Sequence, residues 1–198
     1  MKKLCQFALF VFTAAMVGAC AAPAPASVSA PPPAATAAQA GTATEPAASA
    51  AAATTYPLTI ENCGHTLTFD KAPARVVTTY PNAAELLIRL GVGDKIVGSM
   101  YHNDTPVTAE VAEVFNRIPK QFDKYPSKEE LVALEADFAL ATYDSFDFSG
   151  QNGMPSVEEA AGFGLPVYGI STECGGGVNT AATLSLIYDD ILNLGKIF

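Results

Sequence analysis

Three tyrosines stand where a ligand-binding surface could form. Tyr80, Tyr101 and Tyr143 each directly follow a short run of apolar or β-branched residues that is typical of a buried strand. An aromatic ring with a hydroxyl group suits a flat, conjugated ligand with polar edges, because the ring face can stack while the hydroxyl makes a hydrogen bond. The alternative is that these three rings only pack against neighbouring loops.

The same loops carry further polar residues that could contact a ligand. The candidates are Asn82, His102, Ser145 and Thr172. His102 could approach a metal held inside a ligand, and the other reading is a solvated loop position. The second histidine, His65, falls in a predicted hairpin turn and is expected to be exposed and inert. Two histidines are too few for a typical histidine-rich metal site, so we expect neither a metal site nor a resident cofactor.

These loops would be positioned by strands and helices that alternate along the chain. A hairpin is predicted for residues 56–69, from apolar and polar residues that alternate around Asn62-Cys63-Gly64. The predicted strands that follow cover residues 75–79, 95–100, 137–143 and 166–171. Strands joined by helical crossovers predict an α/β fold, with a mainly parallel sheet covered by helices on both faces. Ligands bind beyond the carboxyl ends of such strands, which is where the candidate residues lie.

The predicted helices show recognisable start and stop signals. Three pairs have the form of a capping box, namely Asn82 with Glu85, Ser127 with Glu130, and Ser156 with Glu159. Gly91 and Gly164 stand where helix C-terminal glycines belong, and residues 108–115 form a further short helix. Glu85 is therefore interpreted as a helix cap rather than as a ligand contact.

The last segment of the chain predicts a long amphipathic helix. Its apolar residues at helical spacing are Leu184, Ile187, Ile191, Leu194 and Phe198. An apolar stripe that runs to the final residue indicates that more protein once followed, so we expect residues 56–198 to be a truncated domain.

The N-terminus has the features of a bacterial lipoprotein signal. Lys2 and Lys3 precede an apolar stretch over residues 7–19, which is too short to cross a bilayer and suits a signal peptide. The residues Val17-Gly18-Ala19-Cys20 resemble a lipobox, and this resemblance implies that residues 1–19 are removed and that Cys20 carries the lipid. An ordinary secretory signal and a retained membrane helix are the alternatives. Residues 20–55 are rich in alanine and proline and are predicted to be a disordered tether.

Charge and cysteine content restrict the partners and the compartment. Without Lys2 and Lys3, nine basic residues stand against 20 acidic ones, a net charge near −11. This balance argues against nucleic-acid binding and against adhesion to anionic lipid. In an oxidising compartment Cys63 and Cys174 could form a disulfide, and two free thiols are the alternative.

The predicted domain resembles a known family of binding proteins. The stretch FDKAPARVVTTYPNAAELLIRLGVGDKIVGS, followed by YPSKEELVALEADFALATY and GLPVY, is similar to the N-terminal lobe of substrate-binding lipoproteins of ABC importers for ferric siderophores, haem and cobalamin. The chain departs from the family pattern in two places. Ala74 separates Pro73 from Arg75, and Glu135-Ala136-Asp137 stands where Pro-Asp is usual.

The resemblance implies a function, a location and partners. Family members have two α/β lobes joined by a long helix, and they hold the ligand between the lobes. The resemblance therefore implies a monomeric, extracytoplasmic protein that is anchored to the cell membrane and delivers a small iron or cobalt chelate to a permease. One exposed glutamate of each family lobe pairs with permease arginines. The candidates in this chain are Glu129, Glu130, Glu158 and Glu159.

Two other functions are compatible with a lipid-anchored domain. A lipid-anchored hydrolase is disfavoured because the sequence has neither a G-x-S-x-G nor a GxxxxGK[ST] motif, and Ile96 stands where a dinucleotide fingerprint needs its third glycine. A stalked adhesion module is compatible with the tether, but the tyrosines that follow the strands do not favour it. We therefore expect a protein that is not an enzyme.

Overall fold

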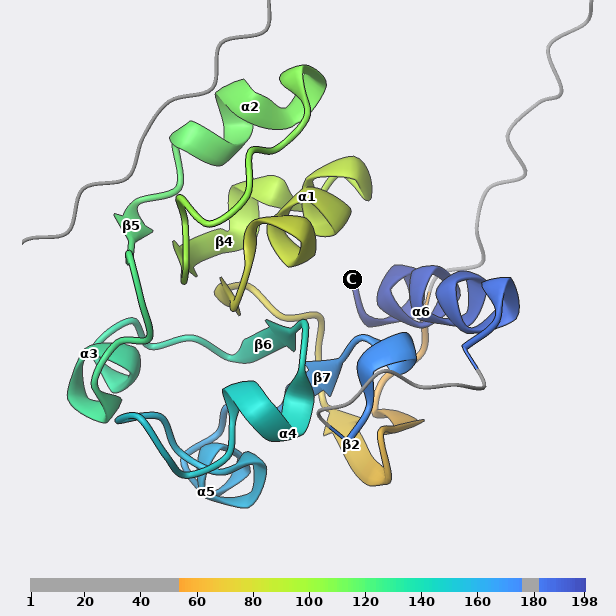
Figure 1. Cartoon of the computed structure of the whole chain (residues 1–198). Coiled ribbons are helices and arrows are strands. Elements are labelled where there is room, and N and C mark those ends of the chain that lie inside the picture. Colours follow the sequence, from red (N-terminus) through yellow and green to blue (C-terminus); the bar gives the residue numbers. More distant parts are fainter. Residues whose placement is uncertain (1–53, 176–181) are drawn as a thin grey trace, which may run out of the picture. The chain divides into compact units, whose positions relative to one another are not determined.

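The computed structural model describes residues 54–175 and 182–198, which fall in one compact unit covering residues 49–198 (Figure 1). The predicted signal peptide, the lipidation site Cys20 and the tether up to residue 53 lie outside the described residues. None of the described helices is long and apolar enough to cross a bilayer.

The hairpin begins the described part of the chain. Strands β1 (Leu58–Asn62) and β2 (His65–Phe69) pair antiparallel, with Leu58 opposite Phe69 and Asn62 opposite His65. Alternate residues of both strands are buried while the threonines between them face solvent. The two turn residues, Cys63 and Gly64, both have positive φ, as a two-residue hairpin turn requires.

A parallel sheet of five strands forms the centre of the domain. Its order is β5-β4-β3-β6-β7, in which β3 (Val76–Thr78) is central. Around it lie β4 (Ile96–Ser99), β5 (Lys120–Gln121), β6 (Phe138–Ala141) and β7 (Val167–Gly169). Every residue of β3, β6 and β7 is buried, as expected for parallel strands covered on both faces. The predicted α/β fold is confirmed. The edge strand β5 was not predicted, and both of its residues are exposed.

Helices and the hairpin cover the two faces of the sheet. One face packs against the hairpin, α1 (Pro81–Arg89), α2 (Ala109–Asn116) and α6 (Leu184–Ile197). The other packs against α3 (Lys128–Val132), α5 (Val157–Gly162) and the short α4 (Asp144–Asp147). Two 3-10 turns, η1 (Gly93–Lys95) and η2 (Ser171–Glu173), complete the described elements. The sheet thus separates two apolar cores, and Figure 1 shows α1 and α2 on one side of it and α3 and α5 on the other.

Two of the three predicted capping boxes are present. Ser127 with Glu130 and Ser156 with Glu159 form both reciprocal hydrogen bonds, so these predictions are confirmed. The third prediction is wrong, because α1 starts at Pro81 and its N-cap is Tyr80, which makes no side-chain capping bond. Proline fits the first helical position since it has no N–H to satisfy there.

Helix α6 forms as predicted, but its buried face differs from the predicted stripe. The buried residues are Asp190, Leu194 and Ile197, whereas Leu184 is 71% exposed and Ile187 is also exposed. Asp190 is buried because its carboxylate accepts hydrogen bonds from the Tyr168 hydroxyl, at 2.7 Å, and from the backbone N–H of Ser171, at 2.9 Å. The hydrogen bonds of Asp190 therefore hold the middle of α6 against the domain, where the predicted stripe would have given an apolar contact.

Candidate binding site at the carboxyl edge of the sheet

The topology produces a natural binding position at the carboxyl ends of β3 and β6. β3 and β6 are neighbours in the sheet. The chain continues from β3 to β4 and β5 on one side of this pair, and from β6 to β7 on the other side. In open α/β sheets ligands bind at such a switch point, because the loops that leave the two strands diverge there. Tyr80 follows β3 and Tyr143 follows β6, so two of the three predicted tyrosines flank this position.

The three tyrosines that the sequence predicts as ligand contacts lie together in the structure, with a fourth tyrosine beside them. Tyr80 and Tyr101 stack with ring centroids 4.9 Å apart and an angle of 10° between the planes. Tyr143 meets Tyr80 edge to face at 5.8 Å, and Tyr125 meets Tyr101 in the same manner at 4.8 Å. We call Tyr80, Tyr101, Tyr125 and Tyr143 the tyrosine cluster. All four side chains are partly exposed, so the cluster belongs to the surface as well as to the packing of the loops.

Tyr125 was missed in the sequence because it follows a strand of only two residues. In the structure its hydroxyl donates a hydrogen bond to Oδ1 of Asp147 at 2.6 Å, and it lies 3.5 Å from the hydroxyl of Tyr80. The other carboxylate oxygen of Asp147 accepts the backbone N–H of Tyr143 at 3.0 Å. Asp147 thus connects the loops that follow β5 and β6 from beneath the cluster.

Burial determines the protonation of these groups. Asp147 is almost fully buried, and desolvation raises the pKa of its carboxyl group against the opposing effect of its hydrogen bonds. Burial also raises the pKa values of the Tyr80 and Tyr125 hydroxyls. Both remain neutral phenols at physiological pH. The cluster therefore offers ring faces and O–H groups to a ligand rather than phenolate charge.

A shallow hollow of about 200 Å³ opens beside the cluster. Its lining residues are Tyr80, Pro81, Asn82, Asp104, Thr105, Thr142 and Tyr143. Sites that enclose a whole small-molecule ligand typically measure about 300–1,000 Å³. The hollow has the size and openness of one wall of such a site.

The other predicted contact residues divide between this hollow and other places. Asn82 lines the hollow, and its side-chain oxygen accepts a hydrogen bond from the hydroxyl of Thr142 at 3.0 Å. Ser145 is exposed on α4, and Thr172 is half-buried in η2 beyond the edge strand β7. Neither of these two residues lines the hollow.

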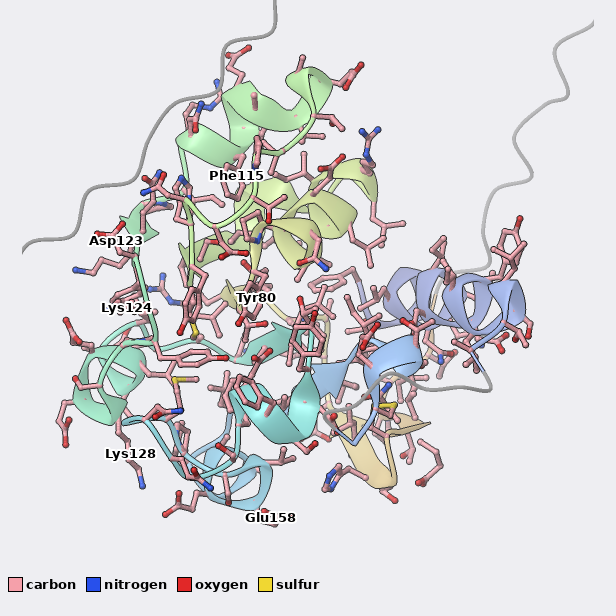
Figure 2. All side chains as sticks on the ribbon, viewed as in Figure 1. Tyr80, Phe115, Asp123, Lys124, Lys128 and Glu158 are labelled. Carbon is pink, nitrogen blue, oxygen red and sulfur yellow. A yellow bond between two sulfur atoms is a disulfide. The ribbon has the colours of Figure 1, made fainter. Side chains whose placement is uncertain are left out.

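His102 does not occupy a solvated loop position, and its approach to a metal held inside a ligand stays a prediction. Its side chain is buried, with its ring stacked on Phe115 of α2 at a centroid distance of 4.1 Å (Figure 2 labels Phe115). Its backbone N–H donates to the carbonyl of Phe122, and burial lowers the pKa of the imidazole. The interpretation of His102 as a solvated residue is therefore wrong. His102 does not line the hollow beside the tyrosines but a separate one of about 370 Å³. The solvated interpretation failed because Phe115, from a helix later in the chain, stacks on the imidazole ring.

Glu85 is also placed differently from its predicted role as a helix cap. Its carboxylate accepts hydrogen bonds from Arg89, at 2.9 Å, and from the Thr108 hydroxyl, at 2.8 Å. Glu85 thus ties α1 to the start of α2.

A larger hollow, of about 460 Å³, lies at the opposite edge of the sheet. It is lined mainly by apolar residues from the C-terminal parts of α1 and α2, such as Ile88 and Val114. Strands begin there, and loops do not diverge around a switch point. The tyrosine cluster remains the better candidate because it combines aromatic faces, hydroxyl groups and the switch point.

A disulfide fixes the loop that follows β7. Cys63 in the hairpin turn is bonded to Cys174, with Cα atoms 5.1 Å apart and a sequence separation of 111 residues. The bond joins the first described element to a loop at the carboxyl edge of the sheet. Its presence matches the oxidising compartment that the sequence indicates.

The four candidate docking glutamates lie in the first turns of α3 and α5, and all are exposed. Glu130 and Glu159 are engaged in the capping boxes, and Glu159 also pairs with Lys128 at 3.4 Å. Glu129 and Glu158 have no ion-pair partner among the described residues. The structure thus separates two structural glutamates from two whose carboxylates face solvent.

Comparisons with known proteins agree with this fold. No protein-family model matches the chain. The chain is 25% identical over 142 residues to the uncharacterised ABC transporter substrate-binding lipoprotein YvrC of Bacillus subtilis, a match that covers 71% of this chain and 40% of that protein. It thus spans well under half the length of this curated relative.

Solved structures give the same result. A periplasmic binding protein from Veillonella parvula aligns with a TM-score of 0.60 and 26% identity, covering 74% of this chain and 47% of that one. A protein of an ABC-type Fe3+-hydroxamate transport system from Saccharomonospora viridis aligns with a TM-score of 0.56 and 28% identity, covering 73% and 49%. The described domain therefore has the fold of a single lobe of a periplasmic binding protein. Its resemblance to substrate-binding proteins of ABC importers is confirmed.

Proposed function

We propose that this chain is part of an extracytoplasmic, lipid-anchored substrate-binding protein that captures a metal chelate and delivers it to an ABC permease. The observation that carries the proposal is the tyrosine cluster at the switch point of the sheet. It combines stackable ring faces with neutral hydroxyl groups, which suit the conjugated and polar surface of a siderophore complex, haem or a corrinoid. Neither a hydrolase nor an adhesion module is favoured by any feature of this site.

In this proposal the hollow is one of two walls. Its volume of about 200 Å³ is too small to enclose such a ligand, and the similar proteins are about twice as long as the aligned part of this chain. The second wall would come from the part of those proteins that this chain does not span. The exposed apolar residues of α6, which include Leu184, Ile187 and Leu192, are the natural place for that part to pack.

Ligand binding can be tested through tyrosine fluorescence, because the chain contains no tryptophan and four of its seven tyrosines are in the cluster. The chain is titrated with a ferric trihydroxamate, with haem and with cobalamin. We expect saturable quenching by at least one ligand and a weaker response from Tyr101→Ala. Tyr188→Ala serves as the matched control, since Tyr188 is exposed on α6 outside the cluster. A lack of saturable quenching by all three ligands would refute the proposed function.

Docking to the permease would use Glu129 and Glu158. Their carboxylates are free of the capping boxes that engage Glu130 and Glu159, so they can pair with arginines at no cost to helix stability. Replacement of Glu129 and Glu158 by alanine should reduce ligand uptake in cells while leaving ligand binding in solution unchanged. Unchanged uptake by that double variant would exclude both residues as docking contacts.

The lipid anchor is tested at Cys20. In the proposal, a Cys20→Ala chain is released from the membrane fraction, whereas the parent chain stays in it. Retention of the variant in the membrane fraction would favour a retained membrane helix.

A further inference from the structure

Carboxylates are the charged groups closest to the tyrosine cluster. Asp104 lines the hollow beside Tyr80, and it is the one charged residue among the residues lining it. Asp147 lies directly beneath the cluster and is hydrogen-bonded to Tyr125. Asp144, which is also buried, neighbours Asp147 on α4. No lysine or arginine lines this hollow among the described residues.

Two basic residues that follow β5, Lys124 and Lys128, lie away from the hollow. Lys128 pairs with Glu159 of α5 at 3.4 Å. Figure 2 labels Lys124 and Lys128 at the outer margin of the domain, away from Tyr80. The exposed Asp123 adds another negative charge to the loop that carries Lys124, and it accepts a hydrogen bond from Asn103 at 3.1 Å.

Asp104 makes two local hydrogen bonds at the rim of the hollow. Its backbone N–H donates to the carbonyl of Tyr101 at 2.9 Å, so a tight turn carries it directly after the stacked tyrosine. Its carboxylate accepts a hydrogen bond from the hydroxyl of Thr105 at 3.2 Å. The negative charge therefore lies at the rim of the hollow that Tyr80 also lines.

We propose that this wall selects metal chelates that are neutral or positively charged and discriminates against anionic chelates of the same shape. The inference rests on the proposed function and specifies its ligand class. Two physical effects act in the same direction. The carboxylate of Asp104 attracts positive and repels negative charge, and the negative faces of the tyrosine rings favour a cationic group.

This selection divides the candidate ligands by their chemistry. Hydroxamate groups carry a single negative charge each, so a ferric trihydroxamate is neutral at the metal and becomes cationic when its chain ends in an amine. Catecholate groups carry two negative charges each, so their ferric complexes are anionic. Haem carries two propionates at its edge. The wall therefore suits ferric hydroxamates better than catecholates or haem.

The test uses three linear ferric trihydroxamates that are identical at the metal and differ at one chain end. The end is a free amine, an acetylated amine or a succinylated amine, which makes the chelate cationic, neutral or anionic. Each is titrated into the chain with tyrosine fluorescence as the readout. We expect the dissociation constant to increase in that order, by about tenfold across the series at low ionic strength. The difference should shrink as salt is added, because Asp104 is exposed and its charge is screened.

Variants test whether Asp104 is the origin of the selection. Asp104→Asn should narrow the range of the three dissociation constants, and Asp104→Lys should reverse their order. Asp94→Asn is the matched control, since Asp94 is an exposed aspartate at the opposite edge of the sheet. It should leave the series unchanged.

The outcomes separate this inference from the proposed function. Equal dissociation constants for the three chelates, or tightest binding of the succinylated one, would overturn the inference and leave the proposed function standing. The same holds if none of the three binds while haem or cobalamin does. A failure of all of these ligands to bind would overturn both.

Discussion

Asn62 and Gly169 exchange two hydrogen bonds through the side chain of one and the backbone of the other. The Asn62 Nδ2 donates to the Gly169 carbonyl at 2.9 Å, and the Gly169 N–H donates to Asn62 Oδ1 at 2.7 Å. The side-chain amide therefore acts as an additional strand segment beside β7. Together with the disulfide between Cys63 and Cys174, it fastens the hairpin to the carboxyl edge of the sheet.

Gly169 should tolerate no side chain. A Cβ atom at this position would lie 2.6 Å from Asp144 Cβ and 2.8 Å from Cys63 Sγ. We expect Gly169→Ala to lower the free energy of unfolding by about 1–3 kcal/mol, measured by urea denaturation. Gly195→Ala is the control, because an added Cβ atom would meet none of the described residues within 4 Å outside the helix's own backbone, and alanine favours the helix by up to about 1 kcal/mol. Equal stability of the two variants would contradict the close packing seen at Gly169.

Loss of the disulfide should destabilise the domain substantially. The bond closes a loop with a sequence separation of 111 residues, and chain-entropy arguments assign about 4–5 kcal/mol to a loop of this size. We expect the double variant Cys63→Ser with Cys174→Ser to unfold at lower urea concentration than the parent chain. A reducing agent should destabilise the parent and leave the double variant unaffected. If the reducing agent has no effect on the parent, the bond does not form in solution.

The buried carboxyl group of Asp147 should make stability depend on pH. Because burial raises its pKa in the folded state, the folded chain binds this proton more tightly than the unfolded chain does. The contribution is fully present below the ordinary pKa of an aspartate and is lost as the pH rises through the raised value. We therefore expect the free energy of unfolding to decrease as the pH rises, and we expect Asp147→Asn to remove this decrease. Urea denaturation at a series of pH values across the acidic range measures it. If the free energy of unfolding changed with pH equally in the parent chain and in the variant, the prediction would be contradicted.

The hydroxyl of Tyr125 should contribute to stability through its hydrogen bond to the buried Asp147. Tyr125→Phe leaves the ring in contact with Tyr101 but removes the donor to the buried Asp147. An unsatisfied buried acceptor costs about 1–3 kcal/mol, so the free energy of unfolding should fall by that amount. Tyr188→Phe is the matched control and should change nothing, because that side chain is 64% exposed. A loss of stability that is equal in both variants would show that the buried hydrogen bond contributes little.

Local signals in the sequence predicted the parts of the fold that local chemistry determines. The capping boxes at Ser127 and Ser156 involve residues three apart, so the pattern contains the whole interaction. The same pattern at Asn82 and Glu85 failed because Pro81 sets the start of α1, and because Glu85 is taken by Arg89 and a residue from a later loop. Tertiary contacts decided between two locally reasonable arrangements.

The candidate site was predicted only in part for the same reason. Strand ends are recognisable, so Tyr80, Tyr101 and Tyr143 could be expected at one edge of the sheet. Tyr125 could not, because β5 has two residues and forms only by pairing with β4. His102 was misplaced because its burial depends on Phe115, which belongs to another element.

The strand β5 has a consequence for how copies of this protein behave at high concentration. Within residues 54–175 and 182–198 no strand pairs with its outer side, and β5 consists of Lys120 and Gln121, a cation and an amide that are both exposed. So short and polar a margin is a poor template for a foreign strand, while the hairpin blocks the opposite margin. Neighbouring molecules at high concentration would therefore not readily pair their sheets edge to edge.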